Sequence, residues 1–155
     1  MAKKLALIAS KGTLDWAYPP FILASTAAAL DYEVHVFFTF YGLTLLKKDV
    51  SDLKISPLGN PGMPMPVPMP NLVQMIPGME SMATMMMKQK MADKGVASIE
   101  DLRTACLESG VKLIACQMTI DLFDFKPEDF IEGIEFGGAA TFFEFAGESD
   151  VNLFI

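Results

Sequence analysis

Three runs of hydrophobic residues predict the buried strands of a parallel sheet. Leu5–Ala9, Val34–Phe40 and Val111–Met118 are rich in apolar residues, and polar or turn-forming residues bound each of them. Strands covered by helices on both faces show this pattern, because neither surface meets water. A fourth run, Val151–Ile155, is expected to form an edge strand, and a fifth strand stays open.

Helical patterns lie between these strands. Phe21–Leu30 is rich in alanine and follows Pro19 and Pro20, so a helix is expected there, with the prolines near its first turn, where proline is tolerated. Ser98 is expected to cap another helix and Gly110 to end it. This alternation predicts an α/β protein, a three-layer α/β/α fold with a mostly parallel sheet of about five strands. Shorter helices are expected over Leu43–Lys48, Pro127–Ile134 and Ala139–Ala146.

Residues 56–93 interrupt the alternation of strands and helices. They are predicted to form an insertion within a single domain, residues 1–155. Seven of the ten prolines and ten of the twelve methionines lie within it. Proline neither continues a helix nor donates a hydrogen bond to a central sheet. An extended excursion is therefore expected at Met63–Pro70.

A Met-rich helix is expected after this excursion, over Gly78–Asp93, where Met79, Met82 and Met86 recur at helical spacing. Thioether side chains repack easily, so the pattern favours an adaptable contact surface for a second subunit or another protein. Packing of these methionines on their own domain stays open as the alternative.

The composition narrows the class of protein. The chain of 155 residues has a formal net charge of −7, which argues against general nucleic-acid binding, because that binding depends on neutralising phosphates. Two cysteines are too few for a disulfide-stapled secreted domain. The apolar run after Lys4 is shorter than a signal peptide needs, and no stretch is long enough to span a membrane. We therefore expect a cytoplasmic protein.

Candidate chemistry lies where the predicted strands end, because the carboxyl ends of parallel strands form the crevice of such sheets. Cys116 is the nucleophile of high intrinsic reactivity at these ends. A helical turn that begins there would stabilise its thiolate, and Lys11 from a neighbouring strand end is expected to add a positive charge. The sequence therefore favours a functional Cys116 over a buried small hydrophobe.

Cys106 and His35 are weaker candidates. Cys106 shares a predicted helix face with Ile99 and Leu102, so we expect it in the core, with a role as resolving thiol for Cys116 as the alternative. The spacing of the two cysteines matches neither a redox Cys-x-x-Cys nor a zinc signature. His35 is expected to be a hydrogen-bonded core residue, and a single histidine cannot build a multi-histidine metal centre. No metal or cofactor is expected.

Three segments at the strand ends resemble the DsrE/DsrF-like family: Ser10–Pro19, Phe37–Leu43 and Leu113–Thr119. The Met/Pro-rich middle and Gly138–Phe142 are similar to one subfamily of it, sometimes labelled peroxiredoxin-like. The resemblance covers essentially the whole chain and implies a three-layer α/β/α fold, oligomeric assembly and sulfur trafficking. Thr119 departs from the Cys-x-x-Ser of many other members, and the membrane-spanning segments of some subfamily members are not expected here.

In this family a cysteine at the position of Cys116 carries sulfur as a persulfide, which it receives from and passes to partner proteins. The resemblance implies a sulfurtransferase or sulfur carrier, a homo-oligomer, and partners of the rhodanese-like or TusA-like kind. Two other classes stay open: a thiol-dependent peroxidase with Cys106 as resolving thiol, and a non-catalytic assembly module. The residues expected to stabilise the Cys116 anion or line its pocket are Lys11, Gly12, Tyr41, Gly42, Gln117 and Thr119.

Overall fold

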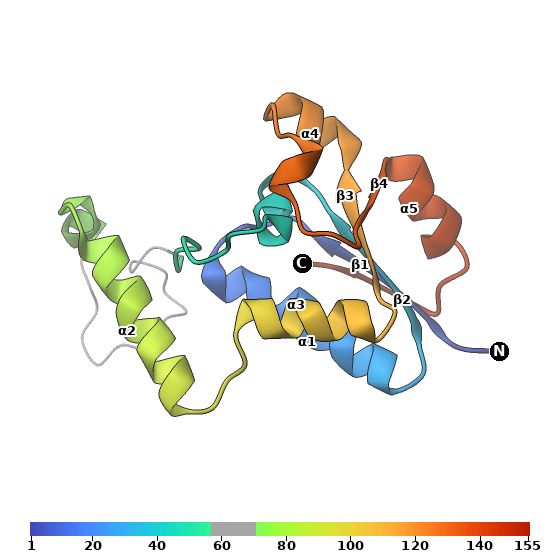
Figure 1. Ribbon diagram of the computed structural model, residues 1–155, viewed down its shortest axis with the longest axis horizontal. Coiled ribbons are helices and arrows are strands. Elements are labelled where there is room, and N and C mark those ends of the chain that lie inside the picture. Colours follow the sequence, from blue (N-terminus) through green and yellow to red (C-terminus); the bar gives the residue numbers. More distant parts are fainter. Residues whose placement is uncertain (57–70) are drawn as a thin grey trace.

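The computed structural model describes residues 1–56 and 71–155, and within them a five-stranded parallel sheet lies between two layers of helices (Figure 1). The strands are arranged in the order β4-β3-β2-β1-β5, and every neighbouring pair is parallel. The predicted α/β/α fold with its parallel sheet is confirmed. The bounds of the strands are β1 Lys4–Ala9, β2 Glu33–Phe38, β3 Lys112–Cys116, β4 Glu135–Gly137 and β5 Val151–Phe154.

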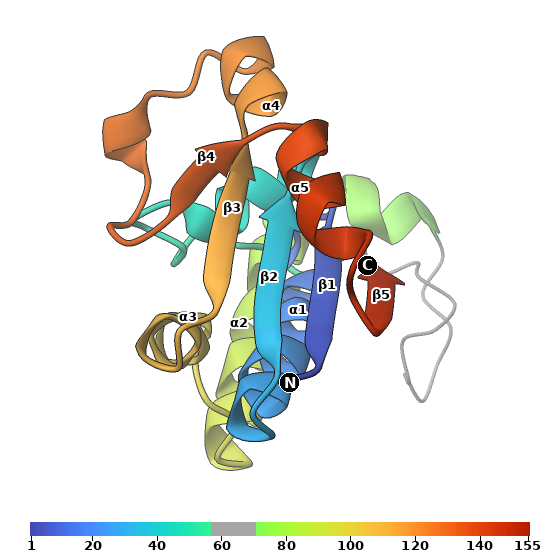
Figure 2. The same cartoon turned by 90° about the vertical axis from the view of Figure 1, so that its right-hand side faces the viewer.

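Helices cover both faces of the sheet. Helices α1 and α3 lie on one face, α5 lies on the other, and α4 continues from the end of β3 (Figure 2). Two neighbouring residues of β2 mark the faces: the Phe38 ring is 5.7 Å from that of Phe21 in α1, whereas the Phe37 ring is 5.5 Å from that of Phe142 in α5. The bounds of the helices are α1 Leu14–Ala29, α2 Met79–Asp93, α3 Ile99–Glu108, α4 Gln117–Leu122 and α5 Ala139–Ala146.

Helix α1 begins earlier than the sequence pattern indicated, and Pro19 and Pro20 lie in its interior. The expectation that these prolines mark the first turn was wrong. Tertiary contacts hold that turn, because the backbone N–H of Leu14 donates to the carbonyl of Lys54 at 2.7 Å. Burial of one helix face offsets the hydrogen bonds that the prolines cannot make. This buried face consists of Leu14, Ala17, Pro20, Phe21, Ala24 and Ala27.

Three other elements differ from the hydrophobic pattern. Phe40–Leu46 is a 3-10 helix that begins before the helix predicted at Leu43–Lys48, and the segment after α4 has only a short 3-10 turn, Pro127–Asp129. Strand β4 is the strand that the pattern did not locate. It has three residues, of which only Phe136 is a large apolar one, so it lacks a hydrophobic run.

The predicted ends of helix α3 are confirmed. The side chain of Ser98 caps the helix, because its Oγ accepts a 3.1 Å hydrogen bond from the backbone N–H of Asp101. Gly110 follows the helix with a φ of +78°, a left-handed conformation that favours glycine at this position.

Helix α2 projects from the body of the domain (Figure 1). Its anchor is Thr84, which is buried and whose hydroxyl accepts a 3.1 Å hydrogen bond from the backbone N–H of Ile55. Met82, Met85 and Met86 are 52%, 71% and 67% exposed. These three side chains are therefore half or more exposed among the described residues, whereas Met79, Met87 and Met91 are partly buried.

The predicted insertion is described only in part. Its helix is confirmed as α2, whereas the extended excursion predicted at Met63–Pro70 lies outside the described residues. Among the helices of residues 1–56 and 71–155, none combines the length and the apolar character that crossing a membrane requires.

Candidate functional site

Cys116 lies at the junction of a strand and a helix, as the last residue of β3 and the N-cap of α4. It is 5% exposed. Alternate residues of a strand share a face, and Ile114 pairs in register with Phe37, which contacts Phe142 of α5. Cys116 therefore belongs to the α5 face of the sheet, at its carboxyl edge.

Strand β4, the neighbour of β3 in the sheet, leads into helix α5 (Figure 2). Cys116 pairs in register with Gly137 of β4, and neighbouring strands lie about 4.8 Å apart. Helix α5 begins two residues later, and a Cβ placed on Gly137 would come within 3.0 Å of the Thr141 hydroxyl. Sequence reasoning did not select Gly137 or Thr141 as site residues. The one local signal for them is the pair of glycines, Gly137 and Gly138, that leads into the helix.

Gln117 and Thr119 follow the cysteine on α4, but both side chains have other partners. Thr119 is fully buried, and its Oγ1 accepts a 3.0 Å hydrogen bond from the backbone N–H of Phe40. The Gln117 side-chain amide donates to the carboxylate of Asp121 at 2.9 Å. Cys116 itself, at the N-cap of α4, makes no side-chain hydrogen bond to the backbone of that helix.

Lys11, Gly12 and Tyr41 line a hollow of about 490 Å³ at the end of β1. The Lys11 ammonium lies 3.4 Å from the centre of the Trp16 ring. Because β2 separates β1 from β3, the hollow and the thiol are two strands apart along the same edge of the sheet. A side chain on Gly42 would collide with the backbone at the end of β1, so this glycine permits the close approach of the two strand-end turns.

Exposed apolar side chains surround the turn that carries Cys116. The ring of Tyr41 stacks on that of Phe123, just after α4, with 6.0 Å between centroids. Phe40 and Tyr41 are 43% and 65% exposed, and Met118 and Leu122 of α4 are 58% and 57% exposed. A group of exposed apolar side chains beside a reactive thiol suits contact with another protein.

Cys106 is enclosed on the opposite side of the sheet. It lies on α3, is fully buried, and its Sγ donates to the carbonyl of Phe21 in α1 at 3.5 Å. Burial raises the pKa of the Cys106 thiol to about 11. Since Cys116 belongs to the α5 face and Cys106 packs on the α1 side, the sheet separates the two thiols. A disulfide between them would require the chain to rearrange.

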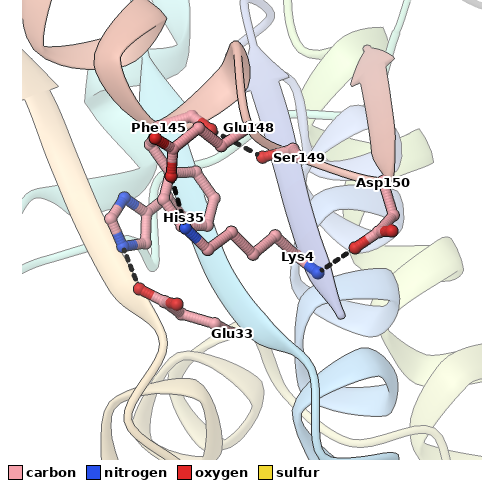
Figure 3. Close-up of polar contacts among 7 residues, drawn as sticks. All are labelled: Lys4, Glu33, His35, Phe145, Glu148, Ser149 and Asp150. Atoms are coloured by element: carbon pink, nitrogen blue, oxygen red, sulfur yellow. Dashed lines mark hydrogen bonds and ion pairs between the residues drawn. The ribbon is translucent and has the colours of Figure 1, made fainter. Parts of the chain in front are cut away.

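His35 lies on the α5 face in a cluster of polar contacts (Figure 3). Its ring stacks on Phe145, with 3.4 Å between centroids and 10° between planes. Its buried Nε2 lies 3.6 Å from the Glu33 carboxylate and has no hydrogen-bond partner among the described residues, so the expected hydrogen-bonded histidine was wrong. Burial, followed by the charge of Lys112, lowers the pKa of His35 below its usual value.

A metal site is not evident in the described ranges. Over residues 1–56 and 71–155, no group of three or more histidine, cysteine, aspartate or glutamate side chains is arranged to hold a metal ion.

The fold and the site together define a small three-layer α/β domain that carries one cysteine at the carboxyl edge of its parallel sheet. The chain belongs to the DsrE/DsrF/DrsH-like family, which matches residues 1–154. The resemblance carried by the strand-end segments is therefore confirmed.

Two relatives and one solved structure extend this comparison. The chain is 68% identical over 157 aligned residues to "Sulfur carrier protein DsrE2" of Allochromatium vinosum, covering 99% of this chain and 98% of that protein. It is 32% identical to "Uncharacterized protein YrkE" of Bacillus subtilis, covering 99% and 97%. The crystal structure of the ychN protein from E. coli matches with a TM-score of 0.55 and 12% identity over 99% of both chains, which shows a shared fold.

Proposed function

We propose that this chain is a sulfur carrier in which Cys116 accepts sulfane sulfur as a persulfide and passes it to a partner protein. The observation that carries the proposal is the place of Cys116, between the end of β3 and the first turn of α4. N–H groups at a helix start favour a negative charge on sulfur. The relative from A. vinosum, 68% identical, is named a sulfur carrier protein, which supports the same role here.

The reaction is an exchange between thiols without net oxidation. The Cys116 thiolate attacks the outer sulfur of a donor persulfide, R–S–SH; the bond between the donor sulfurs breaks, and R–S⁻ leaves with the electron pair. An acceptor thiolate then attacks the outer sulfur on Cys116 and regenerates the Cys116 thiolate. Repetition of both halves constitutes a sulfurtransferase activity that needs no metal or organic cofactor.

Donor and acceptor are proposed to be proteins that present their own thiols, of the rhodanese-like or TusA-like kind. At 5% exposure, Cys116 reacts only when neighbouring side chains move or when the partner displaces them. The exposed Phe40, Tyr41, Met118 and Leu122 supply the apolar surface on which such a partner would rest.

Mass spectrometry after treatment with a persulfide donor tests the proposal. The wild type should gain the mass of one sulfur atom per chain, and Cys116→Ser should gain none. Cys106→Ser is the matched control and should load like the wild type, because Cys106 is buried on the other side of the sheet. Loading of Cys116→Ser at the wild-type level would overturn the proposal.

Two alternatives receive different support. A thiol peroxidase with Cys106 as resolving partner is disfavoured, since the sheet separates the two thiols; peroxide consumption by the two single-cysteine variants distinguishes it from a carrier. Assembly through the Met-rich helix has a specific observation in its favour, the exposure of Met82, Met85 and Met86. We propose that this methionine surface contacts a second subunit, alongside the sulfur-carrier role.

A further inference from the structure

Strand β5 forms an apolar edge of the sheet. In the described part of the chain its one neighbour in the sheet is β1 (Figure 2). Its residues, Val151–Phe154, include neither a charged residue nor a proline, which are the features that commonly keep an edge strand from pairing with another chain. Its three apolar side chains are exposed, that of Phe154 by 73%. Such an edge is a template for a further strand.

The backbone groups that point out of the sheet belong to Asn152 and Phe154. Ile155 faces β1, because its N–H donates to the carbonyl of Ile8 at 2.8 Å. Backbone N–H and C=O groups alternate in direction along a strand, so Leu153 also faces β1. Asn152 and Phe154 therefore direct their N–H and C=O groups outward, towards a strand added at this edge.

A hollow of about 360 Å³ lies beside β5 on the α5 face of the sheet. The Asn152 side-chain amide donates to the carbonyl of Ala146 in α5 at 3.3 Å, so Asn152 projects on this face, and Phe154, two residues later, does the same. Phe143 of α5, 69% exposed, and Phe154 both line the hollow. An apolar side chain brought beside Asn152 would therefore enter an apolar site.

We propose that β5 pairs in antiparallel orientation with β5 of a second copy of this chain, about a two-fold axis at Leu153. In this register Asn152 lies opposite Phe154 of the second copy, and each such pair exchanges two backbone hydrogen bonds. The two pairs thus form four hydrogen bonds and leave the pairing of β1 with β5 unchanged. Phe154 of the second copy then lies beside Asn152, at the hollow. The two copies of Asp150 are kept about 20 Å apart, so the acidic residues before the strands do not oppose each other.

The geometry favours a second copy over another protein. The outward groups of Asn152 and Phe154 are arranged symmetrically about Leu153, so the same surface serves both sides of a two-fold contact. At about 200 Å² for an aromatic side chain, the exposed parts of Phe143 and Phe154 offer about 280 Å² per chain. With the rest of β5, two copies approach the roughly 1,000 Å² of the smallest specific interfaces, so we expect a dimer whose population rises with protein concentration.

This contact goes beyond the proposed carrier function and does not depend on it. Strands β2 and β1 lie between β3, which carries Cys116, and β5. Sulfur loading should therefore be unchanged in variants that separate the two copies. Failure of Cys116 to load would overturn the carrier function and leave the β5 contact standing.

Disulfide cross-linking tests the register of the pair. Leu153→Cys should form a disulfide between two copies under mild oxidation, because the Cα atoms of opposite residues at the axis lie about 4.5 Å apart. Val151→Cys is the matched control, since Val151 and Leu153 share one face of the strand and are 37% and 40% exposed. Its two copies would lie about 13 Å apart along the strands, too far for a disulfide. Mass spectrometry of unreduced peptides identifies the bond, and equal cross-linking at both positions would overturn the proposed pairing.

Proline substitution provides a second test that needs no added thiol. Asn152→Pro removes the outward N–H but none of the hydrogen bonds to β1, and should weaken association about tenfold or more, since two of the four backbone hydrogen bonds are lost. Asn152→Ala loses the same side-chain contact with Ala146, keeps the N–H and should associate like the wild type. Light scattering over a range of concentrations measures the mass. A wild-type mass of one chain at every concentration, or equal association of Asn152→Pro and Asn152→Ala, would overturn the pairing.

Hydrogen exchange of the isolated protein tests whether the occupant of the edge is a second copy. The N–H groups of Asn152 and Phe154 should become slower to exchange as the protein concentration rises. Fast exchange of both at every concentration would leave this edge to a different protein and would overturn pairing with a second copy.

Discussion

Thr119 connects the first turn of α4 to the end of β2, because its Oγ1 accepts a 3.0 Å hydrogen bond from the backbone N–H of Phe40. Phe40 has a φ of +47°, in the left-handed region that non-glycine residues adopt at a cost. The contact from the buried Thr119 holds Phe40 in this conformation. The turn that follows Cys116 is therefore tied to the backbone just after β2.

Thr119→Val should destabilise the protein, because valine keeps the shape of threonine but leaves the Phe40 N–H without its acceptor. We expect the free energy of unfolding to fall by about 1–3 kcal/mol. Urea denaturation measures this, with Thr119→Ser as the control that retains the acceptor. Equal unfolding midpoints for the wild type and Thr119→Val would show that the contact contributes nothing.

Alkylation should distinguish the two cysteines. The raised pKa of Cys106, about 11 against the usual 9.0, lowers its thiolate fraction about a hundredfold at mildly alkaline pH, and its full burial slows the reaction further. Iodoacetamide should therefore modify Cys116 in the folded protein and Cys106 only after denaturation. Peptide mapping by mass spectrometry reads out both sites. Modification of both at similar rates would contradict the enclosure of Cys106.

His35 should make the protein less stable in mild acid. Its pKa is lowered in the folded state, mainly by burial, so the unfolded chain binds the proton first as the pH falls. The contribution of neutral His35 to the free energy of unfolding is therefore fully present above the usual histidine pKa of about 6.5. It is lost as the pH falls from there through the lower folded-state pKa. The charged groups that act on His35 are Lys4, Glu33, Lys112 and Glu135.

His35→Phe tests this dependence, because phenylalanine keeps a ring against Phe145 but does not titrate. The loss of unfolding free energy between about pH 7 and pH 5 should be smaller in the variant than in the wild type. Urea denaturation at each pH measures the difference. Identical pH profiles would show that His35 does not titrate at a lowered pKa.

If the methionine surface joins subunits as proposed, replacement of Met82, Met85 and Met86 by glutamine should lower the molecular mass in solution and leave sulfur loading unchanged. These side chains are exposed on α2, and glutamine is a good helix former, so the helix itself should persist. Light scattering after size-exclusion chromatography gives the mass. Leu30→Gln, at an exposed position beyond α1, is the control. An unchanged mass in the triple variant would refute assembly through the methionine surface.

The position of Cys116 could be predicted from the sequence, whereas its surroundings could not. The apolar run of β3 identifies a buried strand, and the end of that run places the cysteine at the edge of the sheet. The neighbour of Cys116 is Gly137 on β4, a three-residue strand without an apolar run, and strand order is set by long-range pairing that local periodicity does not contain. The start of α5 beside the thiol was therefore visible only in the structure.

The start of helix α1 likewise could not be predicted from the local sequence. Local propensity placed its start after the prolines, but the contact of Leu14 with Lys54 and the buried face of the helix extend it past them. Tertiary packing therefore outweighed the helix-breaking preference of Pro19 and Pro20. The residues next to the prolines in the sequence do not reveal these packing contacts.

Transfer of radiolabelled sulfane sulfur tests the central claim most directly. The protein would be loaded from a labelled persulfide, freed of excess donor, and mixed with an acceptor thiol. We predict up to one labelled sulfur per chain, located on the peptide that contains Cys116, which leaves as acceptor persulfide on mixing. Label on the Cys106 peptide, or label on Cys116 that no acceptor thiol removes, would contradict the assignment of Cys116 as a sulfur carrier.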